Sequence, residues 1–458
     1  MKDRSIVAIA LLIVAVLIGD GVAVATHQSD DPAWDARVLP IVHFVQDHRG
    51  LHFKRAVPVE FLSDAAFQKQ VAPDRTESAA DKASLDQFLG ELRALGLVAG
   101  KVDLGKAEDD LTRSSIIGLY VPSKKKVFVR GTELTPAVRV VLAHELTHVL
   151  QDQYFDLAKI RKDAPGGDTT AVTALIEGDA VRIQDLYTAS LSGSDQKAYR
   201  TETIREARAA QSGSSGVPAV LSDFLSFPYA FGPVLLAQLN ATGGNDEIDK
   251  AFRHPPSEEA QVFDPLDHPY TEDPVTLPQP TVPVGAKRIG KTAPFGMISL
   301  FEVLSGRLPY AASLTAVRGW TGDTSQTYSS GGRTCVAIDV ASTGNALLLG
   351  ARAWSATTHA TVTTRDDVVS IRSCDPGAGA RIPARTHPTP FEVLTARAVL
   401  LSTFVTKGAP LKRATCLADG LLARLGPARY KVLLSTALTP AETATIRELA
   451  SQAAQACL

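Results

Sequence analysis

The chain has 458 residues, 45% of them hydrophobic and 21% charged, and its 47 Lys and Arg nearly balance its 49 Asp and Glu. This composition excludes a largely disordered chain and a coiled-coil rod. The near-neutral charge favours neither nucleic acid nor an acidic lipid surface, so we expect no nucleic-acid partner. Because one domain usually holds about 100–200 residues, the length predicts roughly two to four domains.

The N-terminal segment, residues 1–25, has the pattern of an export signal. Two basic residues precede an unbroken apolar run at 6–18, and Ala23 and Ala25 form the small-x-small pattern that signal peptidase cleaves. A cleaved signal peptide and an uncleaved N-terminal membrane anchor both fit, and both interpretations stay open. Either one places the rest of the chain outside the cytoplasm, secreted or anchored to the cell membrane.

Short strands and helices alternate along the chain and predict an α+β fold. Helical spacing of apolar residues occurs at 32–48, 84–97, 168–191, 227–240, 345–355 and through most of 389–458. Strands are predicted at 57–62, 116–121, 127–130, 324–328, 334–340, 360–364 and 368–373, with a hairpin between the second and the third. Pro58 favours an edge position for the first strand.

Two helices have clear starts. One begins with Thr135 as N-cap and Pro136 at its first position, and should reach about Gln153. The last helix opens with Thr439 followed three residues later by Glu442, which is the capping-box spacing.

A proline-rich segment at 254–283 is predicted to lack regular structure, and we place a domain boundary near residue 285. The expected units are the signal or anchor at 1–25, a main unit at 26–285, a small α+β unit at 286–388 and a helical unit at 389–458. All four cysteines lie in the last two units. Their spacing suits Cys335–Cys374 and Cys416–Cys457, although four cysteines allow three pairings. Structural disulfides in an oxidising compartment are the simplest interpretation.

The capped helix contains the sequence HELTH at 144–148. Residues four apart lie on one helical face, so His144 and His148 can both bind a single Zn²⁺. Glu145 is turned towards the same site, where it can accept a proton from metal-bound water. A catalytic zinc site needs a third protein ligand. Glu177 follows Ala-Leu-Ile in a helical stretch and would be poorly solvated without a cation. Its alternative role is a buried salt bridge to Arg182.

The motifs HELTHxLQDQ at 144–153 and EGDA at 177–180 resemble gluzincin-type zinc metallopeptidases, in particular exported bacterial ones, over about residues 36–270. The resemblance implies a zincin-like fold for residues 26–285, with His144, His148 and Glu177 as zinc ligands and Glu145 as general base. The best-known gluzincins carry an aspartate four residues after the third ligand, where this chain has Val181.

Two carboxylates, Asp179 and Asp152, are candidates for orienting a zinc-binding histidine in place of that aspartate. The alternative for Asp152 is a solvated helix end. Three side chains are candidates for steadying the oxyanion: Tyr229, His254 and His268. Their alternatives are a packed aromatic ring for the tyrosine and turn residues beside proline for the histidines. One hairpin strand, 116–121 or 127–130, can pair with an extended substrate.

We therefore expect an exported zinc peptidase acting on a peptide or protein substrate, with a membrane contact if the N-terminal segment is retained. The alternative is a catalytically inactive zincin-fold envelope protein that acts as a binding module. The intact Glu145 favours the enzyme, because a structural zinc site needs no base.

Overall fold

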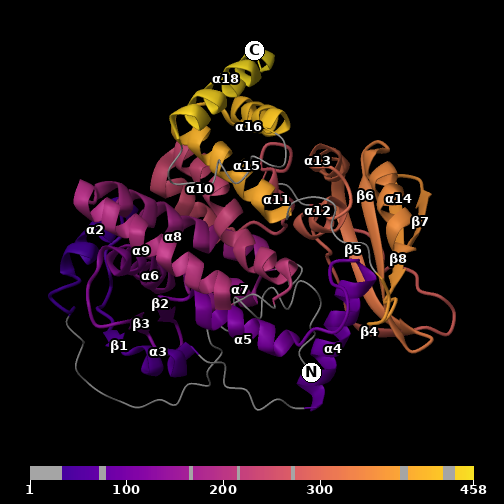
Figure 1. Ribbon diagram of the computed structural model, residues 1–458, viewed down its shortest axis with the longest axis horizontal. Coiled ribbons are helices and arrows are strands. Elements are labelled where there is room, and N and C mark those ends of the chain that lie inside the picture. The colour runs from indigo at the N-terminus through magenta and orange to yellow at the C-terminus, as the bar shows by residue number, and fades with distance from the viewer. Residues whose placement is uncertain are drawn as a thin grey trace.

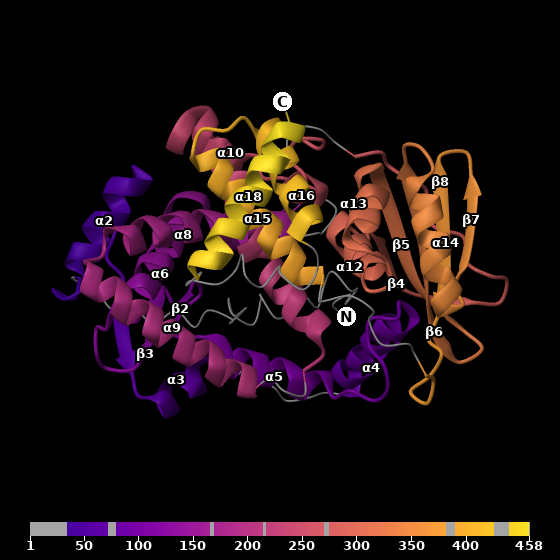
Figure 2. The ribbon, with the colours of Figure 1, turned by 45° about the horizontal axis from the view of Figure 1, so that its top comes forward.

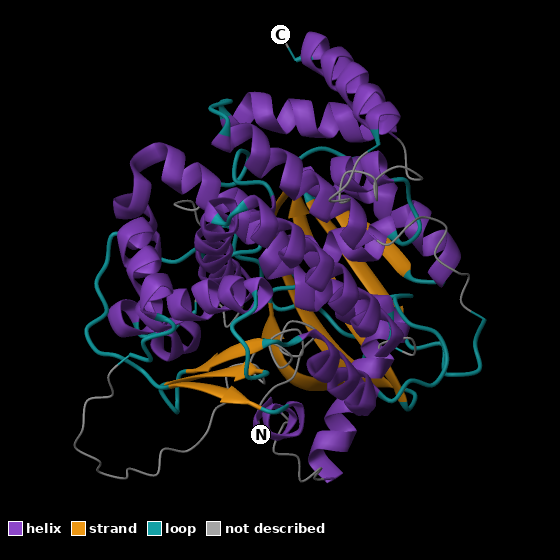
Figure 3. Ribbon diagram, turned by 60° about the vertical axis from the view of Figure 1, so that its left-hand side comes forward, coloured by secondary structure: helices purple, strands orange, loops and turns teal. Residues whose placement is uncertain are grey.

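The computed structural model describes residues 34–71, 79–164, 169–213, 217–269, 274–381, 390–425 and 439–457. The segment 1–25, with both interpretations of it, lies outside the described residues. The described chain is α+β, as expected, with many helices and two separate sheets (Figures 1 and 3).

The first sheet is small and has the order β1-β3-β2. Its strands are β1 (Val59–Leu62), β2 (Gly118–Val121) and β3 (Lys126–Arg130). β1 runs parallel to the central β3, and β2 pairs with β3 as the expected antiparallel hairpin. The predicted edge position of the first strand is confirmed. Since β3 is central, β2 is the hairpin strand that lies at an edge of the sheet, and its four residues are buried.

Ten helices, listed here with their bounds, lie in the described part of the chain before residue 270. They are α2 (Leu39–Arg49), α3 (Asp64–Val71), α4 (Ala79–Ala94), α5 (Leu104–Ser115), α6 (Pro136–Phe155), α7 (Leu157–Lys162), α8 (Thr170–Ser190), α9 (Gly193–Gly213), α10 (Ala219–Arg253) and α11 (Ala260–Phe263). The sequence missed α3, α5, α7, α9 and α11, and placed the start of α2 too early. α11 lies within residues 254–283, so the prediction that this proline-rich segment lacks regular structure is wrong at that point. α9 in particular is mostly polar, so apolar spacing does not mark it.

Helix α6 begins as its sequence predicts. The Thr135 side chain accepts a hydrogen bond from the backbone N–H of Val138, and Pro136 occupies the first helical position. α6 is buried on most sides because it packs against α2, α8, α9 and β2. Thus the helix that carries HELTH lies in the interior, with one face towards the small sheet and another towards α8.

Helices α8 and α10 cross at two glycines. A Cβ on Gly178 would lie 2.5 Å from the backbone of Gly232, so no larger residue fits either position without movement. α10 is the one helix among the described residues that is long and apolar enough to cross a membrane. However, 67% of its most apolar window is buried within the protein, against α8 and α15. This burial is typical of a core helix.

The second sheet has the order β4-β5-β6-β8-β7, and each neighbouring pair is antiparallel. Its strands are β4 (Lys287–Ala293), β5 (Trp320–Ser330), β6 (Arg333–Ser342), β7 (Thr361–Arg365) and β8 (Val368–Cys374). Trp320 opens β5, is 3% exposed and lies in the main hydrophobic core.

The remaining helices are α12 (Met297–Ser305), α13 (Tyr310–Arg318), α14 (Ala346–Thr358), α15 (Pro390–Thr406), α16 (Leu411–Leu425) and α18 (Pro440–Ala456). α15 packs on α10 (Figure 2), and α16 and α18 extend beyond α15, away from the rest of the protein (Figure 1). Both predicted disulfides are confirmed: Cys335–Cys374 joins β6 to β8, and Cys416–Cys457 joins α16 to the end of α18. The capping box of α18 is also present.

One hydrophobic core runs across the boundary expected near residue 285. Phe231 of α10, Phe263 of α11 and Phe301 of α12 form a chain of aromatic contacts, with ring centroids 5.3 and 5.6 Å apart. Glu259, within the proline-rich segment, accepts hydrogen bonds from the first backbone N–H groups of α12. The N-terminal α4 packs on β6 and β8. The domain boundaries stay a prediction, but the contacts across this one are extensive.

Candidate metal centre

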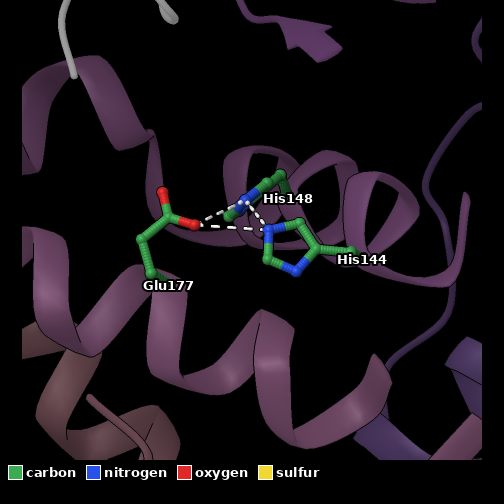
Figure 4. Close-up of side chains that lie close together, drawn as sticks. All are labelled: His144, His148 and Glu177. Atoms are coloured by element: carbon green, nitrogen blue, oxygen red, sulfur yellow. Dashed lines mark hydrogen bonds and ion pairs between the residues drawn. The ribbon is translucent and has the colours of Figure 1, made fainter. Parts of the chain in front are cut away.

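His144 and His148 of α6 and Glu177 of α8 turn their side chains towards one point (Figure 4). The two Nε2 atoms are 3.1 Å apart, and each lies 3.3 Å from Oε2 of Glu177. A zinc ion bound at about 2.0–2.1 Å in tetrahedral directions places its ligand atoms roughly 3.3 Å apart. The separations in this cluster therefore fit a metal ion.

Glu177 does not form the salt bridge to Arg182 that was its alternative. Arg182 instead pairs with Asp179 at 2.9 Å and with the side chain of Asn245 at 2.8 Å. Glu177 is 3% exposed, and its Oε2 accepts no hydrogen bond of good geometry within the described part of the chain. A buried carboxylate oxygen that faces two imidazoles is the arrangement expected of a metal ligand.

The charge of the cluster formed by His144, His148 and Glu177 depends on whether a cation is bound. Burial opposes a charged His148, but the adjacent Glu177 outweighs burial and raises the pKa of His148 to about 9. Burial would likewise raise the pKa of Glu177, yet His148 and His144 hold it well below its usual range. A proton on His148 thus competes with a cation for the same atoms, so metal binding releases a proton.

Two polar side chains, Gln151 and Asp179, orient the His148 ring through its Nδ1 atom. Nδ1 of His148 lies 2.9 Å from Oε1 of Gln151, and Nε2 of Gln151 donates to Oδ2 of Asp179 at 3.1 Å and to the carbonyl of Ile176 at 3.0 Å. Asp179 is ionised and can only accept: burial raises its pKa, but Arg49 and Arg182 lower it to about 2. The Gln151 amide must therefore direct its oxygen at His148, which fixes the proton on Nδ1 and leaves Nε2 for a metal.

Asp179 thus acts on a histidine through Gln151, a residue to which the sequence assigned no role. Its position, three residues after His148, was the available signal. By contrast, Nδ1 of His144 is buried and has no hydrogen-bond partner among the described residues. The two histidines are therefore supported unequally.

The contacts of Asp152 differ from the contact with a histidine that was considered for it. Its carboxylate accepts hydrogen bonds from the Tyr120 hydroxyl at 2.7 Å and from Lys125 at 2.6 Å. Its side chain is 2% exposed, so it is no solvated helix end. These hydrogen bonds link the hairpin to α6. Asp152 makes no hydrogen bond to either histidine within the described residues.

Strand β2 lies directly against Glu145. The backbone N–H of Tyr120 donates to Oε2 of Glu145 at 2.7 Å. Gly118 permits this approach, because a Cβ there would lie 2.4 Å from the Val141 side chain and 3.3 Å from that of Glu145. The second carboxylate oxygen of Glu145 has no hydrogen-bond partner within the described ranges, which suits a group that accepts a proton.

Of the three candidate oxyanion donors, the structure brings Tyr229 to the cluster. Its ring stacks on His144 with centroids 6.2 Å apart, and it is 38% exposed. Burial of the hydroxyl end of Tyr229, together with Glu177 and Glu145, raises its pKa well above the ordinary value, so the hydroxyl keeps its proton. His254 is exposed at the C-terminal end of α10. His268 packs edge-on against Trp320 and lines a cavity of about 270 Å³ beside the second sheet.

Comparison with protein-family models, with characterised proteins and with solved structures finds no match to this chain. The functional argument therefore depends on the geometry of the cluster and on its surroundings.

Proposed function

We propose that this chain is a zinc-dependent hydrolase of peptide bonds, with a zincin-like unit of the gluzincin type in residues 26–285. One observation carries the proposal: a carboxylate, Glu145, is held by a strand next to three converging metal ligands. Two imidazoles and one carboxylate are the donor set of many catalytic zinc sites, and they leave one coordination position open.

The residues of the chain divide the reaction between them. A divalent ion bound to the cluster supplies a Lewis acid that polarises the scissile carbonyl. Glu145 accepts the proton of the attacking water with its free oxygen and delivers it to the leaving amine. The Tyr229 hydroxyl donates a hydrogen bond to the developing oxyanion. The open edge of β2, beside Glu145, is placed to pair with an extended peptide.

The two disulfides fit an oxidising compartment, and we extend this to export. On this proposal the segment 1–25 delivers the protein across the cell membrane and is either removed or kept as an anchor.

The decisive test compares the full chain with Glu145→Gln and Glu177→Ala. Glu145→Gln should keep about one zinc per chain, as should the wild type, and should lose cleavage of casein or of a peptide mixture by roughly 10²–10⁴-fold. Glu177→Ala should lose most of its zinc, because it removes a ligand. Zinc content and peptide release from the same preparations give both answers.

The outcomes separate the proposal from its alternative. Zinc bound without cleavage in the wild type would favour the inactive binding module. Equal zinc content in the wild type and in Glu177→Ala would remove Glu177 from the ligand set.

A further inference from the structure

Arg161 is a buried cation beside the metal cluster with no assigned partner. It lies on α7, the short helix that follows α6, and its neighbours Leu157 and Ile160 pack in the main core. All three guanidinium nitrogens of Arg161 are buried, and none has a hydrogen-bond partner among the described residues. An arginine stays charged in such a place, and an unpaired buried charge is costly.

The carboxylates that act most strongly on Arg161, Glu177 and Asp152, belong to the site. Its strongest electrostatic interactions are with Glu177, Tyr229 and Asp152. Glu177 faces the two histidines, and Asp152 is engaged by Tyr120 and Lys125. The Tyr229 hydroxyl keeps its proton and carries no charge. Thus the guanidinium lies near the cluster, while Glu177 and Asp152 interact with other side chains.

The charge balance changes when a divalent cation is present. Glu145, Glu177 and Asp152 then face two extra positive charges in addition to Lys125 and Arg161. Among these groups the ion offsets Glu145 and Glu177, and Lys125 offsets Asp152, so the charge of Arg161 stays unmatched and favours an anionic group on the incoming molecule. A guanidinium is a planar fork that matches a carboxylate with two parallel hydrogen bonds.

We propose that Arg161 binds a carboxylate of the substrate next to the scissile bond. The inference rests on the proposed peptidase function and names its substrate class: peptides that present a carboxylate near the cleavage point. A peptide has two sources of this group, the free C-terminus and the side chains of Asp and Glu. Arg161 is a specificity-determining residue and takes no part in proton transfer.

The test measures binding without turnover, using the full chain that carries Glu145→Gln and is loaded with zinc. A mixture of acetylated hexapeptides with free C-termini is titrated by calorimetry, and the same mixture with amidated C-termini serves as the comparison. A second pair of mixtures, both amidated, contains either Glu or Gln near the centre. We expect one carboxylate mixture to bind roughly 10- to 100-fold more tightly than its neutral counterpart. Which of the two pairs shows the difference identifies the source.

The preference should disappear when Arg161→Gln is added and should be intermediate with Arg161→Lys, which keeps the charge but not the fork. Lys162→Gln changes an exposed cation on the same helix and should leave the preference intact. Zinc content and thermal stability show that each variant is folded. If Arg161→Gln does not fold, Arg161→Lys decides in the same assay.

Two results would overturn the inference. Equal binding of the carboxylate and neutral mixtures to the Glu145→Gln protein would show that no carboxylate is recognised, whatever the peptidase activity of the wild type. A preference that survives both Arg161 variants would assign the carboxylate to another residue. If no mixture binds and the wild type cleaves nothing, the peptidase proposal falls together with this one.

Discussion

The region around the metal cluster and the C-terminal region are held together by different kinds of interaction. In the first, Arg49 of α2, Asp179 of α8 and Gln151 of α6 form a buried polar chain that ends on His148. In the second, disulfides join β6 to β8 and α16 to α18. A buried charge pair fails when one member is lost, whereas a disulfide acts mainly on the unfolded chain. The comparison therefore predicts which substitutions and truncations destabilise each region.

The largest effect is expected from separating the two regions. A fragment ending at residue 285 would expose the faces of Phe231, Phe263 and α4 that now pack on α12, β6 and β8. It would also leave Arg93 of α4 without Asp375, its partner at 2.6 Å. We expect the 26–285 fragment to lack a cooperative unfolding transition, as measured by circular dichroism and calorimetry. A sharp transition with zinc bound would show that the fragment is an independent folding unit.

Arg49→Met should cause the largest loss among single substitutions in the metal-centre region. The Arg49 side chain is fully buried between Asp179, at 2.7 Å, and Asp249, at 2.6 Å. Removing it leaves two carboxylates short of a partner, which should reduce the free energy of unfolding by about 3–5 kcal/mol and weaken zinc binding. The measurements are urea denaturation and zinc affinity.

The matched control for Arg49→Met is Arg37→Met. Arg37 forms a 2.6 Å ion pair with Asp35 but is 51% exposed, so its loss should change stability far less than the loss of Arg49. Similar losses in both variants would mean that burial does not set the strength of these pairs.

Removing the disulfides tests the other side of the comparison. The bridges span 39 and 41 residues, and a loop of that size is worth roughly 3–4 kcal/mol in the chain-entropy model. Substituting both cysteines of either pair with alanine should reduce stability by up to this amount and leave the zinc content unchanged. Hydrogen exchange should place the loosening in the second sheet for one pair and in α16 and α18 for the other. Zinc loss in either double variant would contradict the separation of roles.

The sequence predicted what local patterns encode. The start of α6, the helical spacing that brings His144 and His148 together, the hairpin and both disulfides follow from caps, helical spacing, turn residues and cysteine spacing. It did not predict contacts between distant segments. Arg49 meets Asp179 across 130 positions, and Arg93 meets Asp375 across 282. Periodicity shows that a face is apolar but not which partner covers it. The polar chain of Arg49, Asp179 and Gln151 and the core that crosses residue 285 are therefore visible only in the folded structure.

The smallest predicted effect concerns pH and lies at the junction of the two regions. Glu91 of α4 is 1% exposed, and it accepts hydrogen bonds from Gln87 at 3.0 Å and from Thr327 of β5 at 2.8 Å. Burial raises the pKa of Glu91 to about 7, whereas an unfolded glutamate has a pKa near 4.3. Below the unfolded pKa the carboxyl is protonated in both states and costs nothing. As the pH rises towards 7, the unfolded state ionises first, so this group lowers the stability of the folded protein.

Glu91→Gln should therefore be more stable than the wild type above pH 7, by about 3 kcal/mol, and the two should converge near pH 4. The comparison of the two proteins isolates this residue, because the metal cluster titrates equally in both. Urea denaturation at several pH values between 4 and 8 measures the difference. Parallel stability curves would mean that Glu91 is ionised when folded, and that the junction between α4 and β5 is better solvated than its burial indicates. Stability curves that converge at low pH would instead show that Glu91, in the core shared by the two regions, destabilises the folded protein when it is ionised.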